Sequence, residues 1–322
     1  MMPTLMDDDI SCAAEILQRG GVVAFPTETV YGLGADALNP QAVARVFAIK
    51  RRPPDHPLIV HLPDISYLND WARDIPEAAY TLAEKFWPGP LTLILKRSAT
   101  VPDNVTGGQD SVGLRVPGHP VALALLKTFG GGVAAPSANR FGHVSPTRAE
   151  HVREELGSEV DMILDGGPCR VGVESTIVSL LDVHPLILRP GAISRSMLAE
   201  ALGEEIETGA AGKITLRAPG MLASHYAPHT PLYQVSAAEL DTRASALVAQ
   251  GRRVGVLTRH KAGHKPELYY YLLTDDPKGY AHELYDTLHK ADAQQWDVLL
   301  IEELPQDEAW LAVRDRVTRA AT

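Results

Sequence analysis

The segment from Gly21 to His61 constrains the fold of this chain more than any other part of the sequence. Residues 22–25 are all apolar and predict a buried strand, and a polar loop, PTET, follows at 26–29. Residues 40–50 carry apolar side chains at the spacing of one helix face, and a second apolar strand follows at 58–60. This strand–helix–strand order is typical of α/β proteins, whose ligands bind near the ends of strands.

Both ends of the helix in this segment carry recognisable signals. Asn39 is a favourable N-cap, and Pro40 suits the first helical position. At the other end, the basic residues Lys50-Arg51-Arg52 precede two prolines, which the helix cannot include. Cations also suit the negative end of a helix dipole, so Lys50 and Arg52 taken alone favour a solvated helix end over a ligand site.

Helix and strand patterns alternate along about the first 200 residues, which predicts a mixed α/β sheet with helical cover. We expect strands at 91–95, 112–116, 133–135, 162–164, 176–180 and 186–188, and helices at 10–18, 77–86, 119–129, 194–202 and from a cap at Thr147 to Leu156. A stretch rich in Gly, Ala, Pro and Thr follows, and then strands at 254–257 and 298–301 with a helix at 279–291. We therefore predict a first domain at 1–205, a linker at 206–231 and a small α/β domain at 232–322.

Composition narrows the class of protein. The 322 residues are 45% hydrophobic and 22% charged, which is ordinary for a globular chain, and the formal net charge of −10 gives no reason to expect a general nucleic-acid binder. Two cysteines exclude a disulfide framework, and the acidic start of the sequence is unlike a secretory signal. Because no apolar run is long enough to span a bilayer, we expect a cytoplasmic protein with no membrane partner.

The usual nucleotide-binding motifs are missing from the sequence. No Walker loop occurs, and Gly32-Leu33-Gly34 lacks the third glycine of a dinucleotide fingerprint. A nucleotide site must therefore depend on dispersed cations and hydroxyls. Ser137 and Asn139 follow a strand two residues apart, so in an extended backbone both face one ligand, but a turn that caps the local backbone is equally consistent.

Arginines and a glycine-rich loop provide further candidates. Arg115 lies inside an apolar strand and needs an anionic partner, which is either a ligand or a protein carboxylate. Arg189 follows a strand and either reaches a phosphate or, more commonly, forms a surface ion pair. Ser175 follows a loop at 165–173 that suits an anion or is simply a flexible surface loop. Cys169 in that loop has no His or Asn context that supports a nucleophile.

Taken together, these motifs resemble the YrdC-like family of threonylcarbamoyl-AMP synthases. The motifs are PTETVYGLG from Pro26, the Lys50-x-Arg52 pair, PLIVH ending in His61, GLRVP around Arg115, the Ser137-x-Asn139 pair, ESTIV around Ser175 and RPG from Arg189. APGM at 218–221, SHYAP at 224–228 and the extra C-terminal domain resemble the two-domain members. The resemblance implies a YrdC-like twisted mixed sheet and a small Rossmann-like α/β C-terminal domain.

The resemblance also implies a reaction in which L-threonine, bicarbonate or CO2, and ATP yield L-threonylcarbamoyl-AMP and pyrophosphate. The product then passes to a threonylcarbamoyl-transfer complex that modifies adenosine beside the anticodon of tRNA, with no need for direct tRNA binding by this chain. Mg²⁺ is expected with the ATP, held mostly by phosphates and waters rather than by a protein metal site. Such a reaction needs cations around a polyphosphate and a clamp for a small zwitterion, but no covalent nucleophile.

Motif by motif, the resemblance assigns two sets of residues. The threonine set, with the arginine on the substrate carboxylate, is Thr29, His61, Arg115, Ala135 and Ser175. The ATP set is Lys50, Arg52, His56, Ser111, Ser137, Asn139, Ser145, Arg189 and Tyr226. Lys50 and Arg52 are the expected catalytic residues, because their charge suits the charge that develops on phosphate. Tyr226, on the linker, is expected to act as a lid that excludes water.

Other functions are compatible with parts of this pattern. The hydrogenase-maturation carbamoyltransferase contains a YrdC-like module, but its acylphosphatase domain and zinc fingers do not fit 322 residues with two cysteines. A double-stranded RNA-binding module is disfavoured by the acidic charge and the lack of aromatic stacking motifs. A non-catalytic sensor of ATP or threonine is the third alternative. Threonine-dependent consumption of ATP distinguishes the enzyme from the last two.

Overall fold

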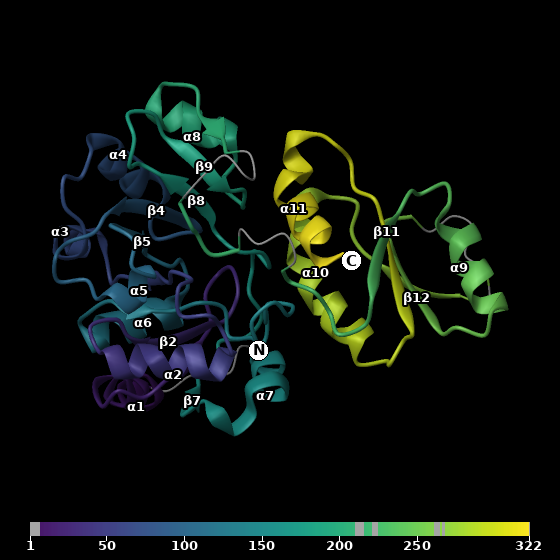
Figure 1. Ribbon diagram of the computed structural model, residues 1–322, viewed down its shortest axis with the longest axis horizontal. Coiled ribbons are helices and arrows are strands. Elements are labelled where there is room, and N and C mark those ends of the chain that lie inside the picture. Colours follow the sequence, from purple (N-terminus) through teal and green to yellow (C-terminus); the bar gives the residue numbers. More distant parts are fainter. Residues whose placement is uncertain (1–6, 210–215, 221–224, 261–264, 266–267, 322) are drawn as a thin grey trace. The chain divides into compact units, whose positions relative to one another are not determined.

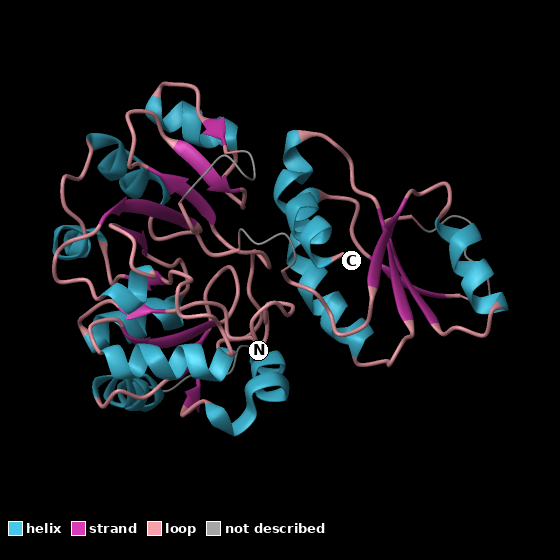
Figure 2. Ribbon diagram, viewed as in Figure 1, coloured by secondary structure: helices cyan, strands magenta, loops and turns pink. Residues whose placement is uncertain are grey.

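A computed structural model describes residues 7–209, 216–220, 225–260, 265 and 268–321. The chain forms two compact units (Figure 1, Figure 2). The first comprises Met1–Phe141, Pro146–Arg170 and Glu174–Met221, and the second comprises Gly142–Ser145, Val171–Val173 and Leu222–Thr322. Within the predicted linker, residues 210–215 and 221–224, which include the last residue of APGM and the first of SHYAP, lie outside the described residues.

A ten-stranded mixed sheet forms the centre of the first unit, in the order β10-β9-β8-β4-β5-β3-β6-β2-β1-β7. The strands are β1 (Val23–Phe25), β2 (Gly32–Asp36), β3 (Ile59–His61), β4 (Leu91–Lys96), β5 (Ser111–Arg115), β6 (Val133–Ala134), β7 (Met162–Ile163), β8 (Thr176–Ser179), β9 (Leu186–Arg189) and β10 (Glu207–Thr208). The helices are α1 (Asp7–Gln18), α2 (Pro40–Lys50), α3 (Leu68–Trp71), α4 (Glu77–Phe86), α5 (Asp103–Thr106), α6 (Pro120–Phe129), α7 (Ala149–Leu156) and α8 (Arg195–Leu202), with 3₁₀ turns at Ile65–Tyr67 and Gly157–Glu159. The predicted mixed sheet with helical cover is confirmed.

Helix α2 has the ends that the sequence predicts. The Oδ1 atom of Asn39 accepts hydrogen bonds from the backbone N–H groups of Gln41 and Ala42, both at 3.1 Å, and Pro40 is the first helical residue. An N-cap of this kind stabilises a helix by about 1 kcal/mol. The helix ends at Lys50, after which Arg51 adopts a left-handed conformation with a φ of 52°. Short-range interactions thus place Lys50 at the helix end.

Strand β2 is not predicted, because two of its five residues are glycine, which strands disfavour. It pairs antiparallel with β1 and places Gly34 opposite Val23. A Cβ atom at Gly34 would lie 2.7 Å from the ring of Phe25 and 2.8 Å from a methyl group of Val133, so the strand requires glycine at this position. The glycines that match part of a dinucleotide fingerprint therefore allow close packing within the sheet.

The predicted cap of helix α7 is wrong. The helix begins at Ala149, with Arg148 at the N-cap position and no side-chain capping bond. His151, in the first turn, accepts the N–H of Thr147 through Nδ1 at 3.2 Å. An imidazole on the helix, rather than a hydroxyl before it, therefore ties the preceding loop to the helix.

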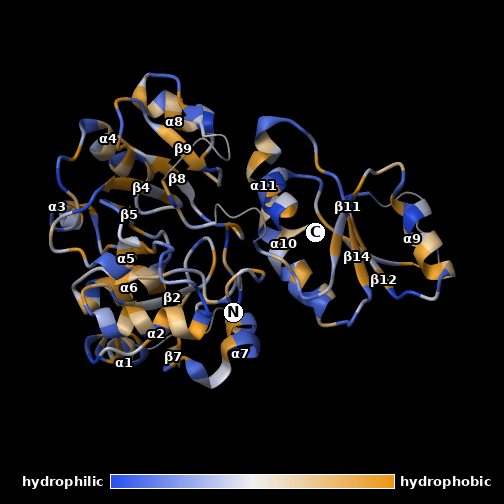
Figure 3. Cartoon of the chain, viewed as in Figure 1, coloured by the Kyte–Doolittle hydropathy of each residue, from blue (hydrophilic) through white to orange (hydrophobic). Residues whose placement is uncertain are grey.

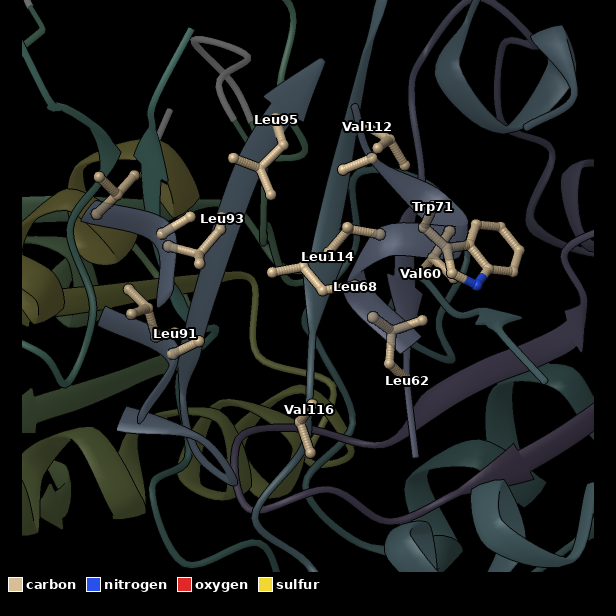
Figure 4. Close-up of a cluster of buried hydrophobic side chains, with 14 of the residues drawn as sticks. Val60, Leu62, Leu68, Trp71, Leu91, Leu93, Leu95, Val112, Leu114 and Val116 are labelled. Atoms are coloured by element: carbon tan, nitrogen blue, oxygen red, sulfur yellow. The ribbon is translucent and has the colours of Figure 1, made fainter. Parts of the chain in front are cut away.

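Alternation along the central strands separates an apolar face of the sheet from a face that carries both polar side chains and a smaller apolar cluster. The apolar face packs in one cluster, drawn in Figure 4, that includes Val60, Leu62, Trp71, Leu91, Leu93, Leu95, Val112, Leu114 and Val116. Fully burying a side chain such as leucine contributes roughly 1.5–3 kcal/mol relative to leaving it exposed. In Figure 3 the residues of strands such as β4 are accordingly mostly orange, whereas the helices alternate between orange and blue residues.

The second unit contains a four-stranded sheet that is parallel throughout, in the order β11-β14-β12-β13. Its elements are β11 (Leu232–Val235), α9 (Leu240–Ala249), β12 (Val254–Thr258), β13 (Tyr269–Leu272), α10 (Pro277–Asp292), β14 (Val298–Glu302), a 3₁₀ turn at Glu308–Trp310 and α11 (Leu311–Ala320). Helix α9 covers one face of this sheet, and α10 and α11 cover the other (Figure 1). The predicted small Rossmann-like α/β fold is confirmed. Among the residues that the structure describes, no helix is long and apolar enough to cross a membrane.

Candidate active site

Three neighbouring strands of the first unit carry polar side chains on the face opposite the apolar cluster. Thr92 on β4, Arg115 on β5 and His61 on β3 each alternate with residues of that cluster, so they point to the other face. His61 and Arg115 are Cα partners in the parallel pair β3–β5, and all three residues are less than 5% exposed. Because buried polar groups need hydrogen-bond partners, the partners of these residues define the site.

The partner of Arg115 is Glu28, in the PTET loop that follows β1. Nη2 of Arg115 lies 2.8 Å from Oε1 of Glu28, and both side chains are only 5% exposed. Nη1 also donates to Oγ1 of Thr29 at 3.0 Å, and Nε donates to the carbonyl oxygen of Gly89 at 3.2 Å. The sequence predicts either a ligand or a protein carboxylate as the anionic partner of Arg115, and the structure shows the protein carboxylate. Glu28 is absent from the predicted site, although it is the acidic residue of the loop that carries Thr29.

The PTET loop is held in shape by its own hydroxyl groups. Oγ1 of Thr27 donates to the carbonyl oxygen of Val30 at 2.6 Å and lies 2.8 Å from Oγ1 of Thr29. The backbone N–H of Thr29 in turn donates to Oγ1 of Thr27 at 3.1 Å. Thr29 is therefore fixed on both sides, by Thr27 and by Arg115.

His61 is a neutral member of the site at pH 7. Burial, with a further contribution from the nearby Arg115 guanidinium, lowers the pKa of His61 to about 3. Its ring packs edge-on against Phe25, with the centroids 6.1 Å apart. His61 can therefore take part in hydrogen bonding but does not bring a positive charge.

Ser175 and Arg189 extend this polar face along the sheet. Oγ of Ser175 lies 2.7 Å from Oγ1 of Thr92 and accepts a hydrogen bond from Nη2 of Arg189 at 3.2 Å. Arg189 also donates through Nε to the carbonyl oxygen of Ser175 at 3.0 Å and through Nη1 to that of Pro219 at 2.9 Å. Arg189 is only 4% exposed, so the interpretation as a surface ion pair is wrong.

A second cluster forms where the end of α2 meets the loop after β6. Nζ of Lys50 donates to the carbonyl oxygens of Ser137 and Asn139, both at 2.5 Å, and the side chain of Lys50 is buried. Burial, followed by repulsion from Arg52, lowers the pKa of Lys50 well below its usual value. The solvated helix end that Lys50 and Arg52 favour in isolation is therefore wrong.

Arg52 and His56 lie beside Phe141 in this cluster. The guanidinium carbon of Arg52 is 5.4 Å from the centroid of the Phe141 ring, and Nη2 donates to the carbonyl oxygen of Pro57 at 2.9 Å. The imidazole of His56 is 5.2 Å from the same ring. Burial, and then the charge of Arg52, lower the pKa of His56. The structure thus brings together Lys50, Arg52 and His56 through their shared neighbours.

The other predicted residues of the first unit have mixed outcomes. The backbone bends at Ala138 and Asn139, and Nδ2 of Asn139 donates to the carbonyl oxygen of Arg140 at 2.8 Å, so the assumption of an extended Ser137–Asn139 segment is wrong. The N–H of Ala135 donates to the carbonyl oxygen of Ile59 at 3.0 Å, so this donor is already engaged. Ser111 is the first residue of β5 and Arg115 is the last. At the usual rise of a strand, their Cα atoms are about 13 Å apart.

Ser145 and Tyr226 belong to the second unit, and their contacts are described within it. The carbonyl oxygen of Ser145 lies 3.2 Å from Nε2 of His289. Tyr226 is 1% exposed and has a positive φ of 65°. Its ring packs against Tyr285, with centroids 5.9 Å apart, and under the guanidinium of Arg316 at 5.3 Å. The predicted roles of Ser145 and Tyr226 toward a nucleotide stay predictions.

The described residues contain no evident site for metal binding or for nucleophilic catalysis. No group of three or more His, Cys, Asp or Glu side chains there is placed to hold a metal ion. Cys169 is buried, and burial raises the pKa of its thiol. What the first unit does offer is a polar sheet face with buried arginines and hydroxyls and, at the end of α2, a buried ammonium group. This is an arrangement suited to small anionic or zwitterionic ligands.

The fold and the site thus define a two-unit α/β protein with a buried, cation-bearing face on a mixed sheet. Comparison with known families narrows this class. A family model described as "Telomere recombination" (Sua5, YciO and YrdC) matches residues 15–191, and one described as "Threonylcarbamoyl-AMP synthase, C-terminal domain" matches residues 193–322. The chain belongs to the threonylcarbamoyl-AMP synthase family.

Individual relatives agree over nearly the whole chain. The threonylcarbamoyl-AMP synthase of Pyrococcus abyssi is 40% identical to this chain, over 97% of this chain and 94% of the relative. The threonylcarbamoyl-AMP synthase of Bacillus subtilis is 43% identical, over 98% of this chain and 93% of the relative. The crystal structure of P. abyssi Sua5 complexed with L-threonine superposes with a TM-score of 0.93 at 38% identity, covering 99% of this chain and 96% of that one. The predicted family is therefore confirmed.

Proposed function

We propose that this chain synthesises L-threonylcarbamoyl-AMP from L-threonine, bicarbonate or CO2, and ATP, with release of pyrophosphate, for threonylcarbamoyl-adenosine modification of tRNA. The observation that carries the proposal is the similarity over nearly the full chain to P. abyssi Sua5, a protein whose crystal structure contains L-threonine. The polar side chains of the first unit support it, because two buried arginines, Arg115 and Arg189, each donate a hydrogen bond to a hydroxyl group, that of Thr29 and that of Ser175 respectively.

In this proposal L-threonine lies against Thr29, His61, Arg115, Ala135 and Ser175. The Arg115 guanidinium is the natural partner of the substrate carboxylate, since a guanidinium binds carboxylates through two parallel hydrogen bonds. The hydroxyl group of Thr29 accepts a hydrogen bond from Arg115, and the hydroxyl group of Ser175 accepts one from Arg189. His61, which is neutral, provides a hydrogen bond without repelling the substrate ammonium.

The ATP phosphates lie in this proposal against the cluster of Lys50 and Arg52, with His56, Ser111, Ser137, Asn139 and Arg189 around the nucleotide. The threonine amine adds to CO2 and loses a proton to give a carbamate, and a carbamate oxygen attacks the α-phosphorus of ATP. The bond from that phosphorus to the bridging oxygen breaks, and pyrophosphate leaves with the electron pair. Lys50 and Arg52 stabilise the negative charge on the phosphate oxygens in the transition state.

Mg²⁺ enters with ATP in this scheme, bound to phosphate oxygens and water. The product is a mixed anhydride that water hydrolyses, so it passes to a threonylcarbamoyl-transfer complex as acceptor. We propose a cytoplasmic setting, where ATP, threonine and tRNA are available together.

The test is pyrophosphate release from ATP by the full chain, with L-threonine, bicarbonate and Mg²⁺ each omitted in turn. We expect release to require all three, together with a new threonine-containing adenylate on chromatography. Release that needs threonine but not bicarbonate would show simple amino-acid activation instead. Binding of ATP and threonine without turnover would favour the sensor.

A further inference from the structure

We propose that Glu28 determines which charge type of ligand the amino-acid site accepts, by cancelling the charge of Arg115. The inference rests on the proposed function, in which Arg115 binds the carboxylate of L-threonine. Glu28 itself is a specificity-determining residue that acts through Arg115, since no substrate contact is needed for its effect. It selects zwitterionic amino acids over simple carboxylic acids.

The contacts of Glu28 show that its carboxylate is fixed in place. The residue is 3% exposed, and its two oxygens have separate partners: Oε1 lies 2.8 Å from Nη2 of Arg115, and Oε2 accepts the N–H of Gly118 at 2.8 Å. The backbone and Arg115 together hold the negative charge at one point.

The buried titratable groups that face this ion pair from neighbouring elements, namely His61, His119 and Cys169, are uncharged at pH 7. Burial lowers the pKa of His61 on β3 to about 3, and burial also lowers the pKa of His119 before α6. Burial raises the pKa of the Cys169 thiol, and the charge of Glu28 raises it further. Arg170, which donates to the carbonyl oxygen of Gly118 at 3.0 Å, is exposed to solvent. The buried pair of Glu28 and Arg115 therefore has a net charge of zero.

A neutral site treats ligands of different charge differently. A zwitterion such as threonine brings a carboxylate to Arg115 and its own compensating ammonium, so the buried charge still sums to zero. A carboxylic acid without an amino group would leave one uncompensated negative charge in the buried site, which is strongly disfavoured. Without the charge of Glu28 the site would instead carry one net positive charge, which favours that simple carboxylate.

The test compares dissociation constants, measured by titration calorimetry, for L-threonine and for 3-hydroxybutyrate, which is threonine without its amino group. The wild-type protein is compared with Glu28→Gln, whose amide oxygen can still accept from Gly118, and with Glu84→Gln, the same change at an exposed position of α4. We expect wild type and Glu84→Gln to prefer threonine strongly. In Glu28→Gln the ratio of the two dissociation constants should fall by at least about tenfold, which corresponds to about 1.4 kcal/mol.

The outcomes separate this inference from the function on which it rests. Wild-type protein that binds no threonine would overturn both. Wild-type protein that binds threonine, but binds 3-hydroxybutyrate within about threefold as tightly, would overturn the inference alone, as would an unchanged ratio in folded Glu28→Gln. If Glu28→Gln does not fold, Glu28→Asp decides, because it keeps the charge: its selectivity should stay with threonine even where its affinity falls, and a lost preference would contradict the charge argument.

Discussion

Replacing His61 by asparagine should change how the stability of the first unit depends on pH. The buried ring has a pKa of about 3 in the folded protein, against an ordinary value of 6.5. As the pH falls below 6.5, the unfolded chain binds a proton on His61 and the folded chain does not. The free energy of unfolding of the wild type therefore falls with decreasing pH through this window, by up to about 1.4 kcal/mol per pH unit from this group.

The size of the effect follows from these two pKa values. Between about pH 8 and pH 6, protonation of the unfolded histidine alone lowers the free energy of unfolding by about 0.8 kcal/mol. His61 is 3% exposed, so solvent screening does not reduce this figure substantially. The asparagine variant lacks the proton-binding group in both states, so the difference between wild type and variant should change by this amount.

Urea denaturation at about pH 6 and at about pH 8 measures the free energies of unfolding of wild type and variant. Both pH values lie above the sequence pI of about 5.6, and precipitation would interfere at the pI itself. The variant His184→Asn gives the background for replacing a histidine at the surface. A difference between wild type and His61→Asn that stays constant within about 0.3 kcal/mol would refute the claim that burial keeps this ring neutral.

Two further substitutions test the site and the fold. Arg52→Ala should reduce adenylate formation at least about 100-fold, because it removes a cation from the proposed phosphate-binding cluster. A thermal melt should show that the variant is folded. A variant with native melting and full activity would show that Arg52 does not belong to the site. Gly34→Ala should lower the free energy of unfolding by about 1–3 kcal/mol, because the new methyl group overlaps Phe25 and Val133, and urea denaturation checks this; a variant as stable as the wild type would contradict the packing account of β2.

The parts of the fold that sequence reasoning predicts well are those determined by neighbours along the chain. Asn39 and Pro40 start α2 through bonds and a backbone angle within a single turn, and the alternation of leucines on β4 follows from strand geometry alone. Strand β2 is missed because its glycines are explained by side chains of neighbouring strands, such as Phe25 and Val133, which the local sequence does not reveal. Thr147 is misassigned because the helix begins two residues later, and the backbone N–H of Thr147 instead donates to Nδ1 of His151 in the first turn.

The candidate site shows the same limit more sharply. An arginine in an apolar strand must have an anionic partner, and that much follows from the cost of burying a charge. The identity of the partner does not follow, because Glu28 and Arg115 are far apart in the sequence and meet only when β1 and β5 join one sheet. The bend at Ala138 likewise depends on Lys50, whose ammonium group binds the carbonyl oxygens on both sides of it.

The two ends of the proposed site hold their cations in different ways, and this difference fits the two ligands. Arg115 is paired with a buried carboxylate, so its charge is cancelled before any ligand binds, which suits the zwitterionic amino acid of the proposed function. Lys50 is held by the carbonyl oxygens of Ser137 and Asn139, which orient the ammonium group but do not neutralise it. Desolvation and Arg52 make that charge unfavourable in the free protein, and a polyphosphate would relieve both effects. One sheet and one helix end can thus provide a neutral clamp for an amino acid and a positive clamp for ATP.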